Sequence, residues 1–329
     1  MLCGAIALWV GPGPLAQRAD LAVVRVRTMP LFSYSLLHIA ESEGYFAQEG
    51  LRVEFVEMDA TAAVVPALMR GDIDVLPGVI SPGLLNAIAR GARIRVVAGQ
   101  TQLVQRDCSF MGLVVSRALA GSDALTRPDA LRGRRLAVNR AFATNYLLER
   151  TLAPLGLTPA DFQDVDVPDA LQGDVLRTGR VDIAVVGQPW LHRVLAAGNG
   201  VLWKAFEDAS PDFHYSVVAY GPGLLDRNPE VGLRFMTAYL RAIRQIDRGK
   251  TDRNMGIVAA VTGLDRETIA GACWPIVRED GAVNGAGLLD FQAWALAKGL
   301  VDRPLPLSQM LDDRFVTRAS GRLAKEPAR

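Results

Sequence analysis

The stretch Gly71-Asp72-Ile73-Asp74-Val75 returns in the second half of the chain as Gly179-Arg180-Val181-Asp182-Ile183. After each copy, at nearly the same offsets, come a glycine, a proline and an amphipathic segment that ends at a glycine: Gly78, Pro82 and Gly91, then Gly187, Pro189 and Gly198. Proline at a helix start and glycine just past its end mark the two bounds of a helix. The same unit thus occurs once in each half, which predicts two similar α/β lobes facing each other across a cleft.

Short apolar runs and helical stretches alternate on both sides of the two copies. Around the first copy we expect strands at 21–26, 52–56, 73–76 and 93–98, and helices at 36–43, 62–69 and 84–89. Around the second we expect strands at 135–138, 162–167 and 181–186, and helices at 145–155 and 170–177. This alternation is typical of βα units around a largely parallel sheet. The pattern from 222 to 300 is mostly helical, and the charged tail from Ser320 is expected to be disordered.

Length and composition narrow the class of protein. The chain has 329 residues, enough for about two domains. With 50% hydrophobic and 22% charged residues it has an ordinary globular composition, and a net charge of +1 offers no electrostatic footprint for nucleic acid. The 3 cysteines and 3 histidines are scattered without metal-ligand spacing, so we expect neither a metal site nor a cofactor.

Two cysteines, Cys108 and Cys273, remain if the first segment of the chain is removed. They either form one disulfide or stay as buried free thiols. Because a random pair of cysteines seldom has the geometry that a disulfide requires, the sequence favours free thiols.

The N-terminus is similar to an export signal, but it is incomplete. Residues 2–10 are apolar, 11–14 read Gly-Pro-Gly-Pro, and 15–19 offer small residues for cleavage. The apolar run is too short to cross a membrane, and the basic region that normally precedes it is missing. We expect 1–20 to direct export to the periplasm; the alternatives are a buried strand or a frayed end.

Seven segments, taken in order, resemble the substrate-binding proteins of the nitrate, taurine and alkanesulfonate importers, which share a fold with the yeast-type thiamine-pyrimidine synthases. The segments are 39–46 (IAESEGYF), 49–53 (EGLRV), 67–75 (ALMRGDIDV), 91–98 (GARIRVVA), 171–179, 181–184 (VDIA) and 188–190 (QPW). The resemblance implies an α/β type II periplasmic-binding-protein fold, in which two Rossmann-like lobes surround a ligand cleft. It also implies a monomer that hands a small molecule to the permease of an ABC importer.

This fold, with its two crossings between lobes, sets the expected domain bounds. Lobe 1 should comprise 21–101 plus 216–311, lobe 2 should comprise 110–215, and 312–329 should form a C-terminal tail. Such proteins close when a ligand touches both lobes, since the ligand favours the closed state by its differential affinity.

Ligands of open α/β sheets bind beyond the carboxyl ends of strands, where helices begin. In lobe 1 the candidates on the post-strand loops are Ser33, Tyr34, Asp59, Thr61, Gly78 and Ser81. Ser81 and Thr61 can also cap helices, Asp59 could meet a cationic group, and Gly78 would let the backbone approach a ligand. Tyr34 is a candidate wall of the cleft.

In lobe 2 and the C-terminal helical part the candidates are Asn139, Arg140, Phe142, Thr144, Gln188, Trp190 and Trp274. Many relatives carry glycine and serine where this chain has Arg140 and Phe142, which favours a bulkier ligand. Phe142 could stack on a planar group and Arg140 could pair with an acid, unless Arg140 points to solvent. Trp190 is either core or cleft wall, and Trp274 either closes over the site or packs against helices.

Enzymatic alternatives find little support in the sequence. A thiamine-pyrimidine synthase on the same fold would need a cysteine-rich iron motif and an active-site histidine. Neither occurs in the cleft loops, and there is no Gly-x-Ser-x-Gly elbow, P-loop or dinucleotide fingerprint. A ligand sensor would bring a further domain, for which no segment is long enough. We therefore expect a non-enzymatic binding protein whose ligand has an apolar or aromatic part and an acidic group.

Overall fold

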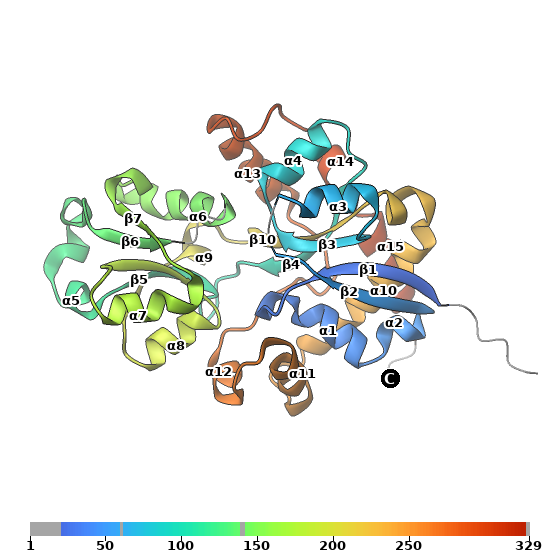
Figure 1. Ribbon diagram of the computed structural model, residues 1–329, viewed down its shortest axis with the longest axis horizontal. Coiled ribbons are helices and arrows are strands. Elements are labelled where there is room, and N and C mark those ends of the chain that lie inside the picture. The colour runs from blue at the N-terminus through green and yellow to red at the C-terminus, as the bar shows by residue number, and fades with distance from the viewer. Residues whose placement is uncertain (1–20, 60–61, 139–141, 327–329) are drawn as a thin grey trace, which may run out of the picture.

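Two five-stranded sheets, one in each lobe, organise the molecule (Figure 1). The computed structural model describes residues 21–59, 62–138 and 142–326. The lobe 1 sheet has the order β2-β1-β3-β10-β4 and comprises β1 (Ala22–Thr28), β2 (Leu51–Glu57), β3 (Val75–Val79), β4 (Arg95–Gln102) and β10 (His214–Tyr220). The lobe 2 sheet has the order β7-β6-β8-β5-β9 and comprises β5 (Met111–Val115), β6 (Arg135–Val138), β7 (Gln163–Asp166), β8 (Ile183–Gly187) and β9 (Val201–Ala205).

Both sheets are mixed: four of the five strands in each run in the same direction, as a largely parallel sheet requires, and one strand is reversed. In lobe 1, β1 runs parallel to β2 and β3, but β10 is antiparallel to β3 and β4. In lobe 2, β6 runs parallel to β7 and β8, but β5 is antiparallel to β8 and β9. The reversed strands β5 and β10 are the ones with which the chain enters each sheet from the other lobe. They begin at the edge where their neighbours end, and therefore run in the opposite direction.

Helices cover both faces of the lobe 1 sheet (Figure 1). One face carries α3 (Val64–Arg70), α4 (Pro82–Ala89), α13 (Gly285–Ala297) and α14 (Leu307–Met310), and the other carries α1 (Ser35–Ser42), α2 (Tyr45–Gln48) and α10 (Pro229–Ile246). Below the sheet in the same view lie α11 (Asp252–Thr262) and α12 (Arg266–Gly271). Lobe 2 contributes α5 (Arg117–Ala120), α6 (Phe142–Leu152), α7 (Gln172–Arg177), α8 (Trp190–Ala196) and α9 (Phe206–Ala209). None of the helices in the described residues is long and apolar enough to span a bilayer.

The repeated sequence stretch makes the same hydrogen bonds to a neighbouring strand in both lobes. In lobe 1, a carboxylate oxygen of Asp74 accepts a hydrogen bond from the backbone N–H of Arg25 at 2.9 Å. In lobe 2, a carboxylate oxygen of Asp182 accepts one from the backbone N–H of Arg135 at 3.0 Å. Each aspartate also donates its own N–H to the carbonyl of the same arginine. The repeat therefore pins the start of one strand to its neighbour, and it confirms that the same unit was used twice.

The C-terminal tail contains a helix, which contradicts the expected disorder from Ser320. Helix α15 (Arg314–Leu323) packs against α10 and buries Phe315, Val316, Ala319 and Leu323. These four residues follow the spacing of one helical face, which the tail's charge and small residues obscured. The apolar stripe has its partner in α10, so the helix is stabilised by burial.

Two short segments, 103–110 and 206–213, connect the sheets, and a disulfide joins the first of them to lobe 1. Cys108 is bonded to Cys273, which follows α12, with Cα atoms 5.8 Å apart. The preference for free thiols is therefore wrong. The two cysteines are 165 residues apart in sequence, and only the path of the crossing, which passes beside the end of α12, brings them together.

Candidate functional site

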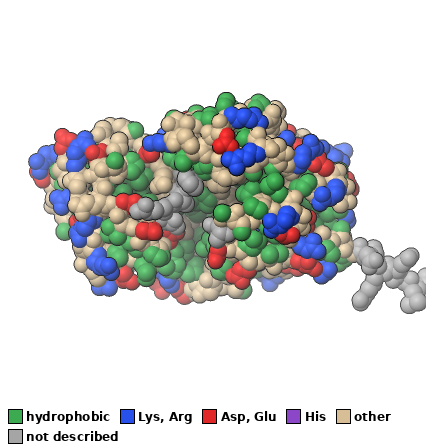
Figure 2. Space-filling model, turned by 45° about the horizontal axis from the view of Figure 1, so that its top comes forward, with side chains coloured by type: hydrophobic (Ala, Val, Ile, Leu, Met, Phe, Trp, Pro, Cys, Tyr) green, Lys and Arg blue, Asp and Glu red, His purple; other side chains and the backbone are tan. Residues whose placement is uncertain are grey.

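The surface is hollowed between the two lobes, and hydrophobic side chains lie on both sides of the hollow (Figure 2). Three of the exposed large apolar residues lie at or shortly after strand ends: Leu31 after β1 is 46% exposed, Val79 at the end of β3 is 39% exposed, and Leu171 after β7 is 51% exposed. Val79 ends β3, and Leu31 and Leu171 lie a few residues beyond β1 and β7. The carboxyl ends of these three strands point toward the other lobe (Figure 1). An apolar molecule between the lobes could cover them.

A buried arginine lies directly beneath these loops in lobe 1. Arg27, near the end of β1, is 3% exposed. Its Nε donates to the carbonyl of Met58 at 3.0 Å, and its Nη1 donates to the carbonyl of Pro77 at 3.1 Å and to the Tyr34 hydroxyl. Arg27 thus ties together the carboxyl ends of the three adjacent strands β2, β1 and β3.

Tyr34 completes this cluster and is itself buried, with 3% of its surface exposed. Its hydroxyl accepts from Arg27 and donates to the carbonyl of Pro77 at 3.0 Å. Burial raises the pKa of Tyr34 to about 12, although the neighbouring guanidinium acts in the opposite direction. The phenol therefore stays neutral, and its polar atom is already bonded within the protein. Ligand contact by Tyr34 stays a prediction.

The remaining lobe 1 candidates surround the same loops. The carbonyl of Ser33 accepts a hydrogen bond from Nε2 of Gln100 at 2.9 Å, and Asp59 is exposed at the end of β2. Ser81 caps α4, as predicted, by accepting from the N–H of Leu84 at 3.3 Å.

Gly78 lies beside the guanidinium of Arg27. A Cβ at this position would lie 3.3 Å from Nη1 of Arg27, so glycine leaves room for the guanidinium beside β3.

In lobe 2, Thr144 lies in the first turn of α6, and Trp190 is the first residue of α8. Thr144 is buried, and its hydroxyl lies 3.2 Å from that of Tyr215 on β10, which links the lobes. Trp190 is partly buried, and the guanidinium of Arg193 lies 5.2 Å from the centre of its ring. Arg193 also pairs with Asp265 beside α12 at 2.7 Å, so this corner of lobe 2 contacts lobe 1 as well.

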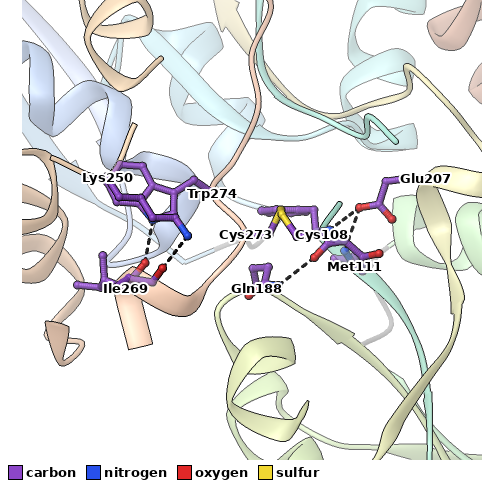
Figure 3. The surroundings of a disulfide bond; sticks show 11 residues. Cys108, Met111, Gln188, Glu207, Lys250, Ile269, Cys273 and Trp274 are labelled. Atoms are coloured by element: carbon purple, nitrogen blue, oxygen red, sulfur yellow. Dashed lines mark hydrogen bonds between the residues drawn. A yellow bond between two sulfur atoms is a disulfide. The ribbon is translucent and has the colours of Figure 1, made fainter. Parts of the chain in front are cut away.

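Figure 3 shows the surroundings of the disulfide, where Trp274 lies on one side of the sulfur atoms and Glu207 on the other. Nε1 of Trp274 donates to the carbonyl of Ile269 at 2.9 Å, and its ring meets Phe32 edge-on at 5.8 Å. Nε2 of Gln188 donates to the carbonyl of Ser109, beside Cys108, at 2.9 Å. The crossing thus brings the predicted residues Gln188 and Trp274 to the same part of the molecule.

Glu207 is a buried acid at the start of α9 that the sequence did not single out. Its Oε1 accepts from the backbone N–H groups of Phe110 and Met111, while its Oε2 is buried without a hydrogen-bond partner in the described residues. Burial raises the pKa of Glu207, because removal from water disfavours the charged form. It holds the end of the first crossing in place.

Four of the predicted positions cannot be placed. Thr61, Asn139 and Arg140 lie outside the described residues, as does the side chain of Phe142, whose backbone begins α6.

Arg27 and Glu207 are the residues that sequence reasoning missed. The first strand was expected to end at residue 26, one position before Arg27, so this arginine fell between a strand and a loop. A charged residue at the carboxyl end of a buried strand was the available signal.

Two shallow hollows lie away from the cleft, at the amino ends of the strands. One, of about 300 Å³, surrounds Asp74, and the other, of about 410 Å³, surrounds Asp182. The repeated aspartate lines each of them, so both lie where that aspartate bonds to the neighbouring strand. The described residues hold no group of three His, Cys, Asp or Glu side chains that could ligate a metal.

Comparison with known proteins identifies the family of this chain. The sequence profile of the NMT1-like family matches residues 17–262. The taurine-binding periplasmic protein of Escherichia coli (strain K12) is 26% identical over 152 residues, which is 46% of this chain and 44% of that protein. The chain thus matches less than half the length of this curated relative.

Solved structures extend the likeness to nearly the entire fold. The periplasmic aliphatic sulphonate binding protein SsuA from Escherichia coli superposes with a TM-score of 0.69 at 18% identity, over 88% of this chain and 92% of that one. The desulfurization enzyme DSZB superposes with a TM-score of 0.66 at 19% identity, over 92% and 99%. At these identities the structures establish the two-lobed periplasmic-binding-protein fold that both share with this chain. The family match covers most of the sequence, and the chain belongs to the NMT1-like family.

Proposed function

We propose that this protein is the extracytoplasmic solute-binding component of an ABC importer, which captures a small organic ligand between its lobes and delivers it to a permease. The observation that carries the proposal is the two-lobed fold, with Leu31, Val79 and Leu171 exposed at or shortly after the ends of β1, β3 and β7. Apolar residues exposed in a concave site are typical of ligand pockets. The likeness to taurine- and sulphonate-binding proteins supports the same function.

The proposal includes the predicted domain bounds. Lobe 1 comprises 21–101 plus 216–311 and lobe 2 comprises 110–215, except that His214 and Tyr215 already belong to β10 of the lobe 1 sheet. The two lobes close on the ligand about the segments 103–110 and 206–213. Helix α15 extends lobe 1 beyond the predicted bound, because it packs on α10. The protein acts as a monomer in the periplasm, with residues 1–20 as its export signal.

Thermal stability offers the first test of ligand binding. Nitrate, alkanesulfonates, pyrimidines and aromatic acids are added separately to the purified protein, and the unfolding temperature is measured. A ligand at 100 times its dissociation constant stabilises the folded state by about 2.7 kcal/mol, which is easily resolved. If no compound of any of these classes raises the unfolding temperature, the proposed ligand class is wrong.

Small-angle scattering with the best compound then tests the mechanism. Ligand-driven closure predicts a smaller radius of gyration with ligand than without, because the ligand favours the state in which it touches both lobes. An unchanged scattering profile at a saturating ligand concentration would contradict closure while leaving binding intact.

We propose binding rather than catalysis, although one structural neighbour is an enzyme. In the described part of the cleft loops, at 29–34, 58–59, 79–81, 167–171 and 187–189, there is no histidine and no thiol. These described loops therefore lack the two residue types, cysteine and histidine, that most often form a nucleophile–base pair. Mass spectrometry of the compound recovered from the protein distinguishes the two functions, since a binding protein returns it unchanged and an enzyme does not.

A further inference from the structure

We propose that the lobes are held together by a fixed joint on one flank and a releasable latch on the other, so that the cleft opens where α8 meets α12. This inference rests on the proposed solute-binding function and specifies the motion that admits the ligand. Two pairs of helices from opposite lobes touch: α6 with α13, in the upper part of Figure 1, and α8 with α12, in the lower part. The two contacts differ in chemistry, and therefore in what it costs to separate them.

The contact between α6 and α13 is a buried aromatic cluster. The ring of Tyr146 on α6 lies 5.0 Å from that of Phe213 in the second crossing. It also lies 5.5 Å from the ring of Phe291 and 5.6 Å from that of Trp294, both on α13. Tyr146 and Phe213 are 2% exposed and Phe291 is 0% exposed. Separation of these helices would return large apolar rings to water, which opposes opening on this flank.

Polar bonds around the cluster join the same two helices. Glu149 on α6 accepts from Nε1 of Trp294 at 3.0 Å and pairs with Lys298 at 2.9 Å. The hydroxyl of Tyr146 donates to Asp290 at 2.6 Å. The second crossing packs into this contact through its last residue, so the contact and the connection form one unit. We therefore assign the joint to α6 and α13.

The contact between α8 and α12 is polar and exposed. Nη2 of Arg193 on α8 pairs with Asp265 at 2.7 Å, and its Nε donates to the hydroxyl of Thr268 at 3.0 Å. These three residues form the latch. The side chains of Arg193 and Asp265 are 43% and 54% exposed, so water and salt screen their attraction. Exposed pairs of this kind contribute little to stability, so the latch breaks at small cost.

Each half of the latch keeps its own bonds when the other half leaves. Asp265 is the N-cap of α12 and accepts from the backbone N–H of Thr268 at 2.7 Å and from its hydroxyl at 2.8 Å. The guanidinium of Arg193 lies 5.2 Å from the centre of the Trp190 ring on its own helix. The N–H and hydroxyl of Thr268, together with Arg193, hold the pKa of Asp265 well below its usual range, so its carboxylate is charged at neutral pH.

Gly271, the last residue of α12, lets the two helices approach closely. A Cβ at this position would collide with the ring of His192 on α8. The predicted ligand residues Gln188 and Trp190 lie at the start of α8, and Trp274 follows α12. Release of the latch therefore parts two walls of the predicted site, and its formation brings them together.

Distances between spin labels in the ligand-free protein test the latch and the joint separately. One pair of labels is placed at the exposed Leu195 on α8 and Glu267 on α12. A second pair is placed at the exposed Ala153, just after α6, and Leu289 on α13. The labels are attached to an unnatural amino acid, so the native disulfide stays intact. Double electron–electron resonance gives the distribution of each distance.

Asp265→Asn removes the charge of the latch and keeps the cap, because asparagine caps helices as well as aspartate does. We expect it to lengthen the Leu195–Glu267 distance and to leave the distance across the joint unchanged. Added salt should do the same in the parent, since it screens an exposed pair. Asp252→Asn is the matched control, because it also removes one exposed charge, but from a pair with Arg266 within lobe 1. It should change neither distance.

Gly271→Ala separates the close approach of the helices from the charge. The added methyl group acts as a wedge against His192, so the Leu195–Glu267 distance should lengthen again. Gly256→Ala on α11 is its control, because a Cβ there would meet nothing within 4 Å. If Gly271→Ala alone has no effect, the close approach of His192 does not belong to the latch.

Two results would overturn the assignment. A Leu195–Glu267 distance that changes neither in Asp265→Asn nor with salt would show that this contact is permanent or plays no part in opening. A distance across the joint that lengthens as much as that across the latch would show that the lobes do not turn on α6 and α13.

Ligand affinity supplies an independent measurement. With the best compound from the thermal panel, Asp265→Asn should bind about two- to five-fold more weakly than the parent, because a smaller closed fraction lowers the apparent affinity. Asp252→Asn should bind as the parent does. Tighter binding in Asp265→Asn would contradict a latch that favours the closed state. If no compound binds the parent, the proposed function fails, and the label distances still decide whether the latch exists.

Discussion

The two segments that connect the lobes are held in different ways. The first crossing, 103–110, is covalently fixed to lobe 1 at Cys108, and at its far end the backbone N–H groups of Phe110 and Met111 donate to Glu207, near the start of the second crossing. The second crossing, 206–213, has no covalent link and leads into His214, a buried residue at the start of β10. The crossings touch where Leu103 and the second segment exchange backbone hydrogen bonds. One connection is therefore fixed by a bond that does not depend on pH, and the other leads into a residue that titrates.

Removal of the disulfide should have the largest effect on stability. Without it, neither crossing would have a covalent link to lobe 1. The Cys108→Ser/Cys273→Ser double variant frees a loop of 165 residues in the unfolded chain. We expect its free energy of unfolding to fall by about 3–5 kcal/mol, as for loops of this length. Urea denaturation measures the loss. The parent treated with a reductant should match the variant, and equal stability of all three would contradict a structural role for the bond.

Acidification should destabilise the fold through His214, at the end of the second crossing. The expected loss in free energy of unfolding is somewhat smaller than that caused by removing the disulfide. Burial lowers the pKa of His214 to about 4, from an ordinary 6.5. The folded state therefore holds the neutral ring, and its contribution is complete above pH 6.5 and is lost as the pH falls toward 4. A shift of this size corresponds to about 3 kcal/mol. Denaturation at a series of pH values should show this slope in the parent.

The variant His214→Gln supplies the control for that slope. Glutamine does not titrate, so its stability should change less between pH 6.5 and 4 than that of the parent. An equally steep profile in the variant would assign the acid sensitivity to other groups.

Glu207→Gln should change the free energy of unfolding least, and it should raise it rather than lower it. Because burial raises the pKa of Glu207, the acid form stabilises the fold below the ordinary value of 4.5, and this contribution is lost as the pH rises through the raised pKa. Glutamine can still accept from the N–H groups of Phe110 and Met111 without a charge. At pH 8 we expect the variant to be as stable as the parent or up to about 1 kcal/mol more stable.

The neighbouring exposed Asp208 provides a matched variant for this experiment. Asp208→Asn also removes one negative charge beside α9 but should not change the free energy of unfolding measurably. A clear loss of stability in Glu207→Gln would mean that the carboxylate itself, in its charged form, holds the crossing.

Local sequence patterns predicted the units of the fold, but not the long-range relations between them. The repeated Asp74 and Asp182 revealed two equivalent lobes, since a motif that pins adjacent strands needs the same residues at the same spacing. The direction of β5 and β10 was missed, because the apolar pattern of a strand is the same whichever way it runs. The tail was misjudged from composition, although Phe315 and Ala319 lie on the face that α10 covers.

The candidate site was predictable only in part, for a related reason. Loops at strand ends identify where a ligand lies, and Ser81 was recognised as a helix cap from its position before a proline. Arg27 was not found in this way, because the groups that hold it, the carbonyls of Met58 and Pro77, are distant in sequence. Their convergence on one guanidinium is visible only once the chain is folded.

The disulfide also turns part of the chain into a closed ring. The whole lobe 2 sheet and the second crossing lie between Cys108 and Cys273, together with β10 and helices α10 to α12 of lobe 1, so all of these belong to one covalent ring. A protease that cuts a loop of lobe 2 opens the ring without dividing the molecule. The two fragments would migrate together until the sulfur–sulfur bond is reduced, and a nicked protein would keep both halves of its cleft.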